Sequence, residues 1–184
     1  MLKKFITCIL LTFMFLTVTL ISYAATMDFT YHVKDNWCVD SGKHLDWSGS
    51  TIYSNNWNTG VNTWNNYKSG VIREDTLLTI NDVTISDVTD LSGNTVAYTL
   101  TTYPVGGGKG TATIQFSTTK MNALSQMKRN IVCTHEIGHT LGLSENNDSG
   151  TNVIMYNNMD RNTSNNVLHS EDKQNYDYMY NNKY

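Results

Sequence analysis

The spacing of apolar residues changes along the chain, and each spacing predicts a type of element. From residue 55 to 67, apolar residues recur at helical spacing: Trp57, Val61, Trp64 and Tyr67. This spacing predicts an amphipathic helix whose tryptophans face the core, although Gly60 lowers its intrinsic stability. A second, central helix is expected over residues 122–142, and a short last helix from Glu171 to Tyr180.

After Ser69-Gly70 the period of the pattern becomes two. β-Branched and aromatic residues then form runs between Asn, Asp and Gly: Thr76 to Ile80, Val83 to Ile85, Val96 to Thr102 and Thr111 to Phe116. These runs predict three or four strands of one twisted sheet. Residues 45–47 and 51–53 are further strand material, the stretch 25–40 predicts a first strand or an ordered arm, and Ser92-Gly93-Asn94 predicts a hairpin turn.

The first 24 residues have the pattern of an export signal. Lys3 and Lys4 form a basic start, Phe5 to Ile21 an apolar run, and Ser22-Tyr23-Ala24 a small-residue cleavage site. We expect cleavage after Ala24, with Ala25 as the second choice. The apolar run is rather short for a membrane span of about 20 residues, which disfavours an uncleaved anchor. Residues 25–184 are then expected to be secreted as one domain, without stable membrane association.

Composition and charge exclude some classes of function. The net charge of −3 and the low share of charged residues, 16%, do not indicate a basic surface for binding nucleic acid. Cys38 and Cys133 remain after signal removal, and either a disulfide or buried free thiols fit the sequence. A less favoured alternative makes Cys38 an inhibitory metal ligand. The carboxylates of Asp82, Asp87 and Asp90 lack the spacing of a calcium loop, so we expect solvated loop acids there.

The candidate chemistry lies in the sequence HEIGHTLGLSE, which runs from His135 to Glu145. Residues four apart lie on one face of a helix, so His135 and His139 can bind one zinc ion. Glu136 is then placed to act on a water molecule as general base. Gly142 allows the chain to leave the helix in a left-handed conformation, which would bring Glu145 to the metal as a third ligand.

Other interpretations of these residues remain open, since an HExxH match alone occurs by chance. The third ligand could be Glu171, as in a gluzincin-type peptidase, or Asp148 in the loop beyond Glu145. His169 is a poorer choice because it is expected at the start of the last helix, where Ser170 can cap it. A protein that binds a peptide or a metal without cleaving is disfavoured, because such a protein has no need of the base Glu136.

The motif and the methionine beyond it resemble a metzincin zinc peptidase. That clan has HExxHxxGxxH with a later methionine turn, and Met155 comes ten residues after Glu145. The order of the expected elements, Leu-Gly-Leu and the pair Met155-Tyr156 are most similar to the matrixin branch. Glu145 stands where the family has a third histidine. An anionic ligand lowers the net charge of the site, so zinc should acidify its water less than in a three-histidine site.

The resemblance implies an α+β fold with a twisted, mostly parallel sheet. It also implies two long helices including the zinc helix, a Met-turn and a short C-terminal helix. The implied activity is that of a zinc endopeptidase whose peptide substrate lies extended along an edge strand, for which we expect Thr111 to Phe116. In some metzincins a tyrosine two places beyond the methionine stabilises the oxyanion. Here that place holds Asn157, so Tyr156 is expected to pack, and the protein is expected to be a monomer.

Overall fold

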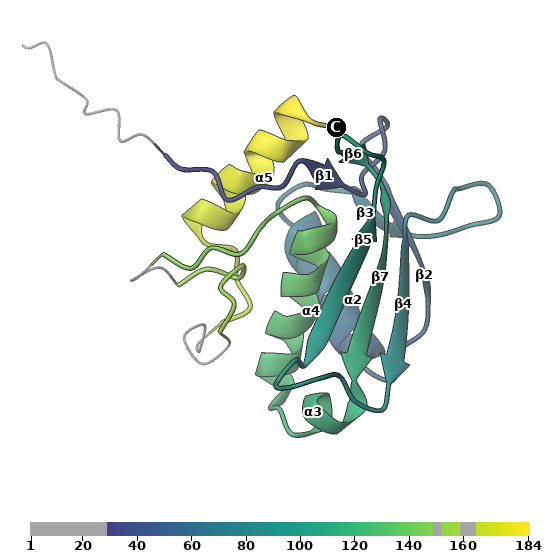
Figure 1. Cartoon of the computed structure of the whole chain (residues 1–184), viewed down its shortest axis with the longest axis vertical. Coiled ribbons are helices and arrows are strands. Elements are labelled where there is room, and N and C mark those ends of the chain that lie inside the picture. Colours follow the sequence, from purple (N-terminus) through teal and green to yellow (C-terminus); the bar gives the residue numbers. More distant parts are fainter. Residues whose placement is uncertain (1–28, 149–151, 159–164) are drawn as a thin grey trace, which may run out of the picture. The chain divides into compact units, whose positions relative to one another are not determined.

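A five-stranded sheet forms one layer of the fold (Figure 1). Its strands, in spatial order, are β3 (Ile72–Glu74), β2 (Leu45–Gly49), β4 (Val83–Val88), β7 (Thr111–Ser117) and β5 (Ala97–Thr102). The first four run parallel to one another, and β5 pairs antiparallel with β7. The expected α+β fold with a mostly parallel sheet is therefore confirmed.

The computed structural model describes residues 29–148, 152–158 and 165–184. Tyr31–Tyr184 forms one compact unit, which contains the sheet and its helices. The expected signal segment, residues 1–24, lies outside the described residues and stays a prediction. In the part of the chain that is described, every helix is too short or too polar to cross a membrane.

Two long helices lie on the same side of the sheet, α2 (Ser54–Asn65) and α4 (Gln126–Thr140) (Figure 1). They confirm the expected pair of long helices. The expected helix 122–142 is in fact preceded by a separate short one, α3 (Thr118–Asn122), because Ser125 begins α4 by accepting a hydrogen bond from the Lys128 N–H. The last helix, α5 (Ser170–Asn182), has 13 residues and is longer than expected.

Helices α2 and α4 approach each other closely at Gly60. A Cβ atom on Gly60 would lie 3.0 Å from the backbone nitrogen of Thr134. In the same contact the Trp64 indole N–H donates to the Thr134 carbonyl at 2.8 Å. The glycine that lowers helix propensity thus permits the helix contact. Trp57 and Trp64 are 1% and 0% exposed, which confirms that both face the core.

The arm before the sheet is ordered, as one of the two alternatives predicted. Strand β1 (Asn36–Trp37) pairs in parallel with β6 (Gly108–Lys109), outside the main sheet. Val33 forms an antiparallel bridge with Leu143, directly after α4. Residues 51–53 form no strand, because β2 ends at Gly49 and α2 begins at Ser54.

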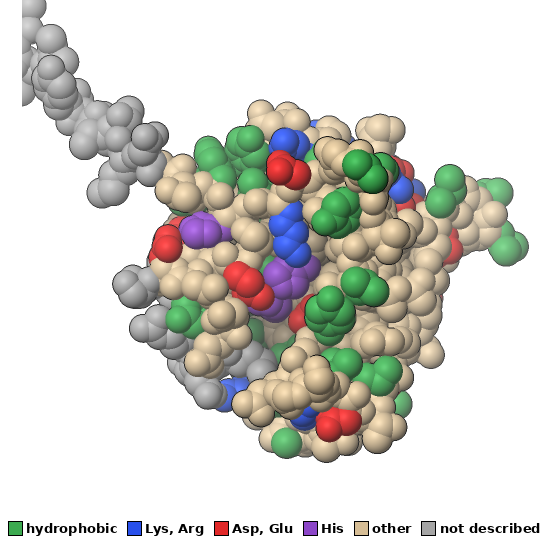
Figure 2. Space-filling model, in the orientation of Figure 1, with side chains coloured by type: hydrophobic (Ala, Val, Ile, Leu, Met, Phe, Trp, Pro, Cys, Tyr) green, Lys and Arg blue, Asp and Glu red, His purple; other side chains and the backbone are tan. Residues whose placement is uncertain are grey.

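The expected strand Thr76 to Ile80 is wrong, since this stretch is a hydrogen-bonded turn. The hydroxyl of Thr79 donates to the Asp75 carboxylate and accepts from the Thr76 N–H. Leu77, Leu78 and Ile80 are almost fully exposed in the loop between β3 and β4. This loop projects from the sheet in Figure 1, and Figure 2 shows hydrophobic side chains gathered on the same projection. Short side-chain bonds to the local backbone have outweighed the β-branched and apolar composition.

Two expectations about the order of the strands are also wrong. Ser92-Gly93-Asn94 lies in the connection from β4 to β5, and these strands are no hairpin because β7 lies between them. For the same reason Thr111 to Phe116 is not an edge strand. β7 pairs on both sides and buries Ala112, Ile114 and Phe116, whereas β5 forms the edge.

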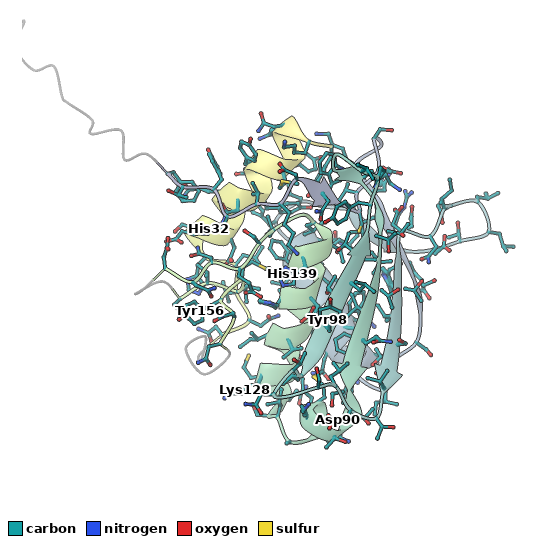
Figure 3. All side chains as sticks on the ribbon, in the orientation of Figure 1. His32, Asp90, Tyr98, Lys128, His139 and Tyr156 are labelled. Carbon is teal, nitrogen blue, oxygen red and sulfur yellow. The ribbon has the colours of Figure 1, made fainter. Side chains whose placement is uncertain are left out.

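The acidic residues at positions 82, 87 and 90 are held by hydrogen bonds and ion pairs, and Asp82 is not solvated. Its carboxylate is 2% exposed, accepts from Lys109 Nζ at 2.6 Å and accepts from the Asp46 N–H at 3.0 Å. Burial raises its pKa. Asp87 accepts from the Thr51 hydroxyl, and Asp90, near α3 in Figure 3, pairs with Lys120.

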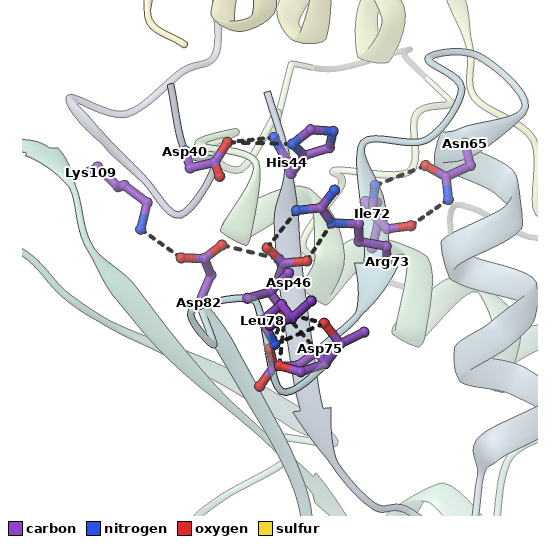
Figure 4. A network of polar contacts seen from close by, with 12 residues as sticks. Asp40, His44, Asp46, Asn65, Ile72, Arg73, Asp75, Leu78, Asp82 and Lys109 are labelled. Atoms are coloured by element: carbon purple, nitrogen blue, oxygen red, sulfur yellow. Dashed lines mark hydrogen bonds and ion pairs between the residues drawn. The ribbon is translucent and has the colours of Figure 1, made fainter. Parts of the chain in front are cut away.

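The carboxylate of Asp82 belongs to a network that joins β2, β3, β4 and β6 (Figure 4). Asp46, also 2% exposed, accepts two hydrogen bonds from the Arg73 guanidinium. Each buried carboxylate therefore has its own cation, which offsets the cost of removing it from water. Within the described residues, Asp82, Asp87 and Asp90 do not converge on a position for a metal ion, so they give calcium no support.

Candidate active site

Helix α4 places the two histidines one turn apart and ends at a point that returns the chain to them. The rings of His135 and His139 are 4.7 Å apart between centroids. After the helix, the Gly142 N–H donates to the His139 carbonyl and the Leu143 N–H to the Gly138 carbonyl. This is a Schellman ending, and Gly142 takes the φ of +83° that the ending requires.

The chain that leaves this turn brings Glu145 to the histidines. Its Oε1 lies 3.4 Å from Nε2 of His135 and 3.4 Å from Nε2 of His139. The Nδ1–H groups donate to backbone carbonyls, that of His135 to Ile154 at 2.8 Å and that of His139 to Leu143 at 3.0 Å. These bonds fix the ring orientations and leave both Nε2 atoms facing Glu145 with lone pairs available to a metal.

The three side chains fit a zinc ion. One ligand atom from each lies within 4.8 Å of the others. Zinc bonds to nitrogen and oxygen of about 2.0–2.2 Å in a tetrahedral site separate neighbouring ligand atoms by roughly 3.3 Å, which matches the distances from Glu145 to the two imidazoles. In addition, Oε2 of Glu145 is buried and has no hydrogen-bond partner among the described residues. Two imidazoles and one carboxylate are a known donor set for zinc hydrolases.

The electrostatics of the group also favour a cation at its centre. Burial raises the pKa of the Glu145 carboxyl, but the two histidines outweigh this effect and lower the pKa to about 2. Burial disfavours the charged form of His135, but the nearby Glu145 and Glu136 outweigh burial and raise the pKa of that imidazole to about 9. Metal binding must therefore compete with protons for these atoms.

Glu136 is buried beside the histidines and is held by the edge strand. Its side chain lies on the turn of α4 between His135 and His139, and the residue is 6% exposed. The hydroxyl of Thr99, in β5, donates to Oε2 of Glu136 at 2.5 Å. The sequence pattern does not single out Thr99, although the alternation in β5 places it on the side opposite Tyr98 and Leu100.

Met155 lies under α4 with no exposed surface. A Cβ atom on Gly138 would lie 2.2 Å from its sulfur, so a larger residue at this position would displace the Met155 side chain. Asp172 fixes the turn around Met155 by accepting from the N–H groups of Ile154 and Met155, at 3.0 and 3.3 Å. The sequence suggests for Asp172 only a favourable place at the start of α5, and it does not predict a buried carboxylate.

The alternative ligands lie elsewhere. Glu171 accepts a hydrogen bond from the Asn146 side chain at 2.6 Å, and Asp148 pairs with His32 at 3.2 Å. Neither belongs to the converging group of described residues. His169 is itself the N-cap of α5, in a capping box with Asp172, so the expectation that Ser170 is the cap is wrong.

Cys38 and Cys133, the cysteines among the described residues, are buried free thiols and do not form a disulfide. Cys38 has no exposed surface, and burial raises the pKa of its thiol to about 12. Burial also raises the pKa of Cys133. Cys38 is not part of the converging group of described residues, so the inhibitory-thiolate alternative is wrong.

A cleft of about 820 Å³ opens in front of these residues. One wall is β5 with the residues just before it, the floor is α4, and the opposite wall is the chain around Ser144, Tyr156 and Asn157. In Figure 3, Tyr98 of β5 and Tyr156 lie on opposite sides of His139. The cleft therefore contains both histidines, Glu136 and Glu145, with an edge strand along one side.

Comparison with known proteins identifies the family of the chain. Residues 23–181 match the family model of the matrixins, Peptidase_M10. Among curated proteins, no sequence matches. One similar solved structure is that of archaemetzincin from Methanopyrus kandleri, which is 12% identical with a TM-score of 0.49, over 78% of this chain and 99% of that chain. Because the family match spans nearly all of the compact unit, the chain belongs to the matrixin family and is a zinc metallopeptidase.

Proposed function

We propose that this matrixin is a secreted endopeptidase in which His135, His139 and Glu145 hold zinc and Glu136 is the general base. The observation that carries the proposal is the convergence of the three ligand atoms within 4.8 Å, beside a buried glutamate in one cleft. Secretion is supported by the signal pattern of residues 1–24. The enzyme is proposed to act as a monomer.

The residues of the cleft divide the chemistry between them. When bound, zinc polarises the scissile carbonyl and lowers the pKa of the attacking water. Glu136 accepts the proton of that water and passes it to the leaving amine. The Thr99 hydroxyl holds one carboxylate oxygen of Glu136, which leaves the other oxygen for the water. The carbonyls of Ile154 and Leu143 keep the imidazoles in place.

The substrate is proposed to lie along β5 rather than along β7. β5 pairs with β7 on one side only, so its other edge offers backbone donors and acceptors to a peptide. Residues 94–99 line the cleft, which places that edge beside the reacting groups. A peptide held along a strand of six residues can extend beyond the cleft in both directions, and this favours cleavage within a chain over removal of terminal residues.

Removal of the metal is the direct test of this function. We expect the purified mature protein to cleave an unfolded protein, such as reduced and alkylated casein, and to lose this activity in a chelator. Zinc added in excess of the chelator should restore the activity, because the folded protein keeps the proposed ligands in place when the metal is removed. Stoichiometric zinc without cleavage would instead favour the binding-protein alternative.

Thr99 gives a second prediction, since its hydroxyl orients the base. Replacing Thr99 with valine keeps the shape of the side chain and removes the hydroxyl donor. We expect the activation free energy to rise by about 1 kcal/mol, so that kcat falls by roughly 5–10-fold with little change in KM. Thr99→Ser should retain kcat. Thr101→Val, on the same face of β5, is the matched control, and full kcat in Thr99→Val would exclude the orienting role.

A further inference from the structure

The arm before β1 places a lysine at the cleft. The Lys34 N–H donates to the Gly142 carbonyl at 2.7 Å, and the Ser144 N–H donates to the His32 carbonyl at 3.0 Å. The arm is thereby paired with the turn that separates the ligands His139 and Glu145. Lys34 is consequently fixed at its backbone next to the metal position, and it lines the cleft.

The ammonium of Lys34 has no fixed partner among the described residues. Its nearest carboxylates engage other groups, because Glu145 faces the two histidines and Glu136 accepts from Thr99. Lys34 is partly buried, and burial holds its pKa below the usual value although the nearby Glu145 and Glu136 act in the opposite direction. A half-buried cation without a close partner is unfavourable by itself, and an arriving anion would offset that cost.

Charge in the cleft points to the kind of group that would pair with it. Lys34 is the one lysine or arginine among the described residues that line the cleft. Of the two glutamates there, Glu145 faces the two histidines and Glu136 accepts a hydrogen bond from Thr99. We propose that Lys34 is a specificity residue that pairs with an aspartate or glutamate side chain of the substrate near the scissile bond. The inference rests on the proposed function and adds a substrate class, peptides with an acidic residue beside the cleaved bond.

Paired fluorogenic peptides test this assignment. Each pair carries glutamate or glutamine at one position, and the position is moved stepwise along both sides of the cleaved bond. We expect glutamate to raise kcat/KM by roughly ten-fold at one position, as for a charge-assisted hydrogen bond. Lys34→Met should bring the glutamate-to-glutamine ratio close to one, Lys34→Arg should keep a preference, and added salt should weaken it.

Two controls separate the assignment from the proposed function. Lys173→Met, on α5 and outside the lining of the cleft, removes the same charge and should leave the ratio unchanged. Binding of the peptide pairs to the Glu136→Gln variant, followed by fluorescence anisotropy, gives the ratio without cleavage. If the wild-type enzyme cleaves casein but does not prefer glutamate at any position, the role of Lys34 is overturned while the proposed endopeptidase function stands. Equal losses on both peptides in Lys34→Met would overturn it as well, since the ammonium would then act on the reacting group.

Discussion

Replacing Glu136 with glutamine is expected to lower kcat by about 10²–10⁴-fold, the range for loss of a general base. The amide has the same shape and can still accept the hydrogen bond from Thr99, but it cannot take the proton of the attacking water. Zinc content should remain that of the wild type, because the proposed ligands are His135, His139 and Glu145. Steady-state kinetics on a peptide, with metal analysis of the same preparation, measure both quantities.

Glu74→Gln provides the matched control for this change. Glu74 is an exposed residue at the end of β3, on the edge of the sheet opposite β5, and its substitution should leave kcat within about two-fold. Wild-type activity in Glu136→Gln would mean that another group accepts the proton, and the proposed mechanism would then be wrong. Loss of zinc in this variant would show that the glutamate supports the metal rather than the proton transfer.

The sequence determines the ligand geometry because that geometry is local. Helical spacing aligns His135 with His139, and a glycine at position 142 permits the left-handed turn that returns Glu145. The groups that support the site were not predictable in this way. Thr99 reaches Glu136 from β5, and Asp172 reaches the Met155 turn from α5, so both contacts depend on how distant elements pack.

In the fold as well, features set by local spacing could be predicted from the sequence, whereas features set by the pairing of distant segments could not. The core-facing tryptophans of α2 follow from helical spacing, and their burial confirms it. Alternation alone does not reveal which strand lies at the edge, since β5 and β7 have similar β-branched composition, and only pairing on both sides distinguishes β7. The apolar stretch after Asp75 is a turn, because the Thr79 hydroxyl accepts from the Thr76 N–H and donates to the Asp75 carboxylate.

Replacing Glu145 with alanine is expected to weaken zinc binding by more than the 10–100-fold that accompanies loss of an outer-shell partner, because a direct ligand is removed. The remaining imidazoles lack the oxygen that lies 3.4 Å from each Nε2, and the site loses a negative charge. Zinc affinity from competition with a chromogenic chelator measures the effect independently of catalysis. Glu145→His, which restores the family's three-histidine pattern, should retain more zinc than Glu145→Ala.

Glu171→Ala separates this ligand assignment from the gluzincin alternative. The Glu171 carboxylate is engaged by Asn146 and lies outside the converging group, so its loss should leave zinc affinity within a few-fold of the wild type. The opposite pattern, with affinity kept in Glu145→Ala and lost in Glu171→Ala, would assign the third ligand to α5. Glu145 is joined to His139 by one short turn, whereas the Glu171 carboxylate would first have to leave the Asn146 side chain to reach the metal position.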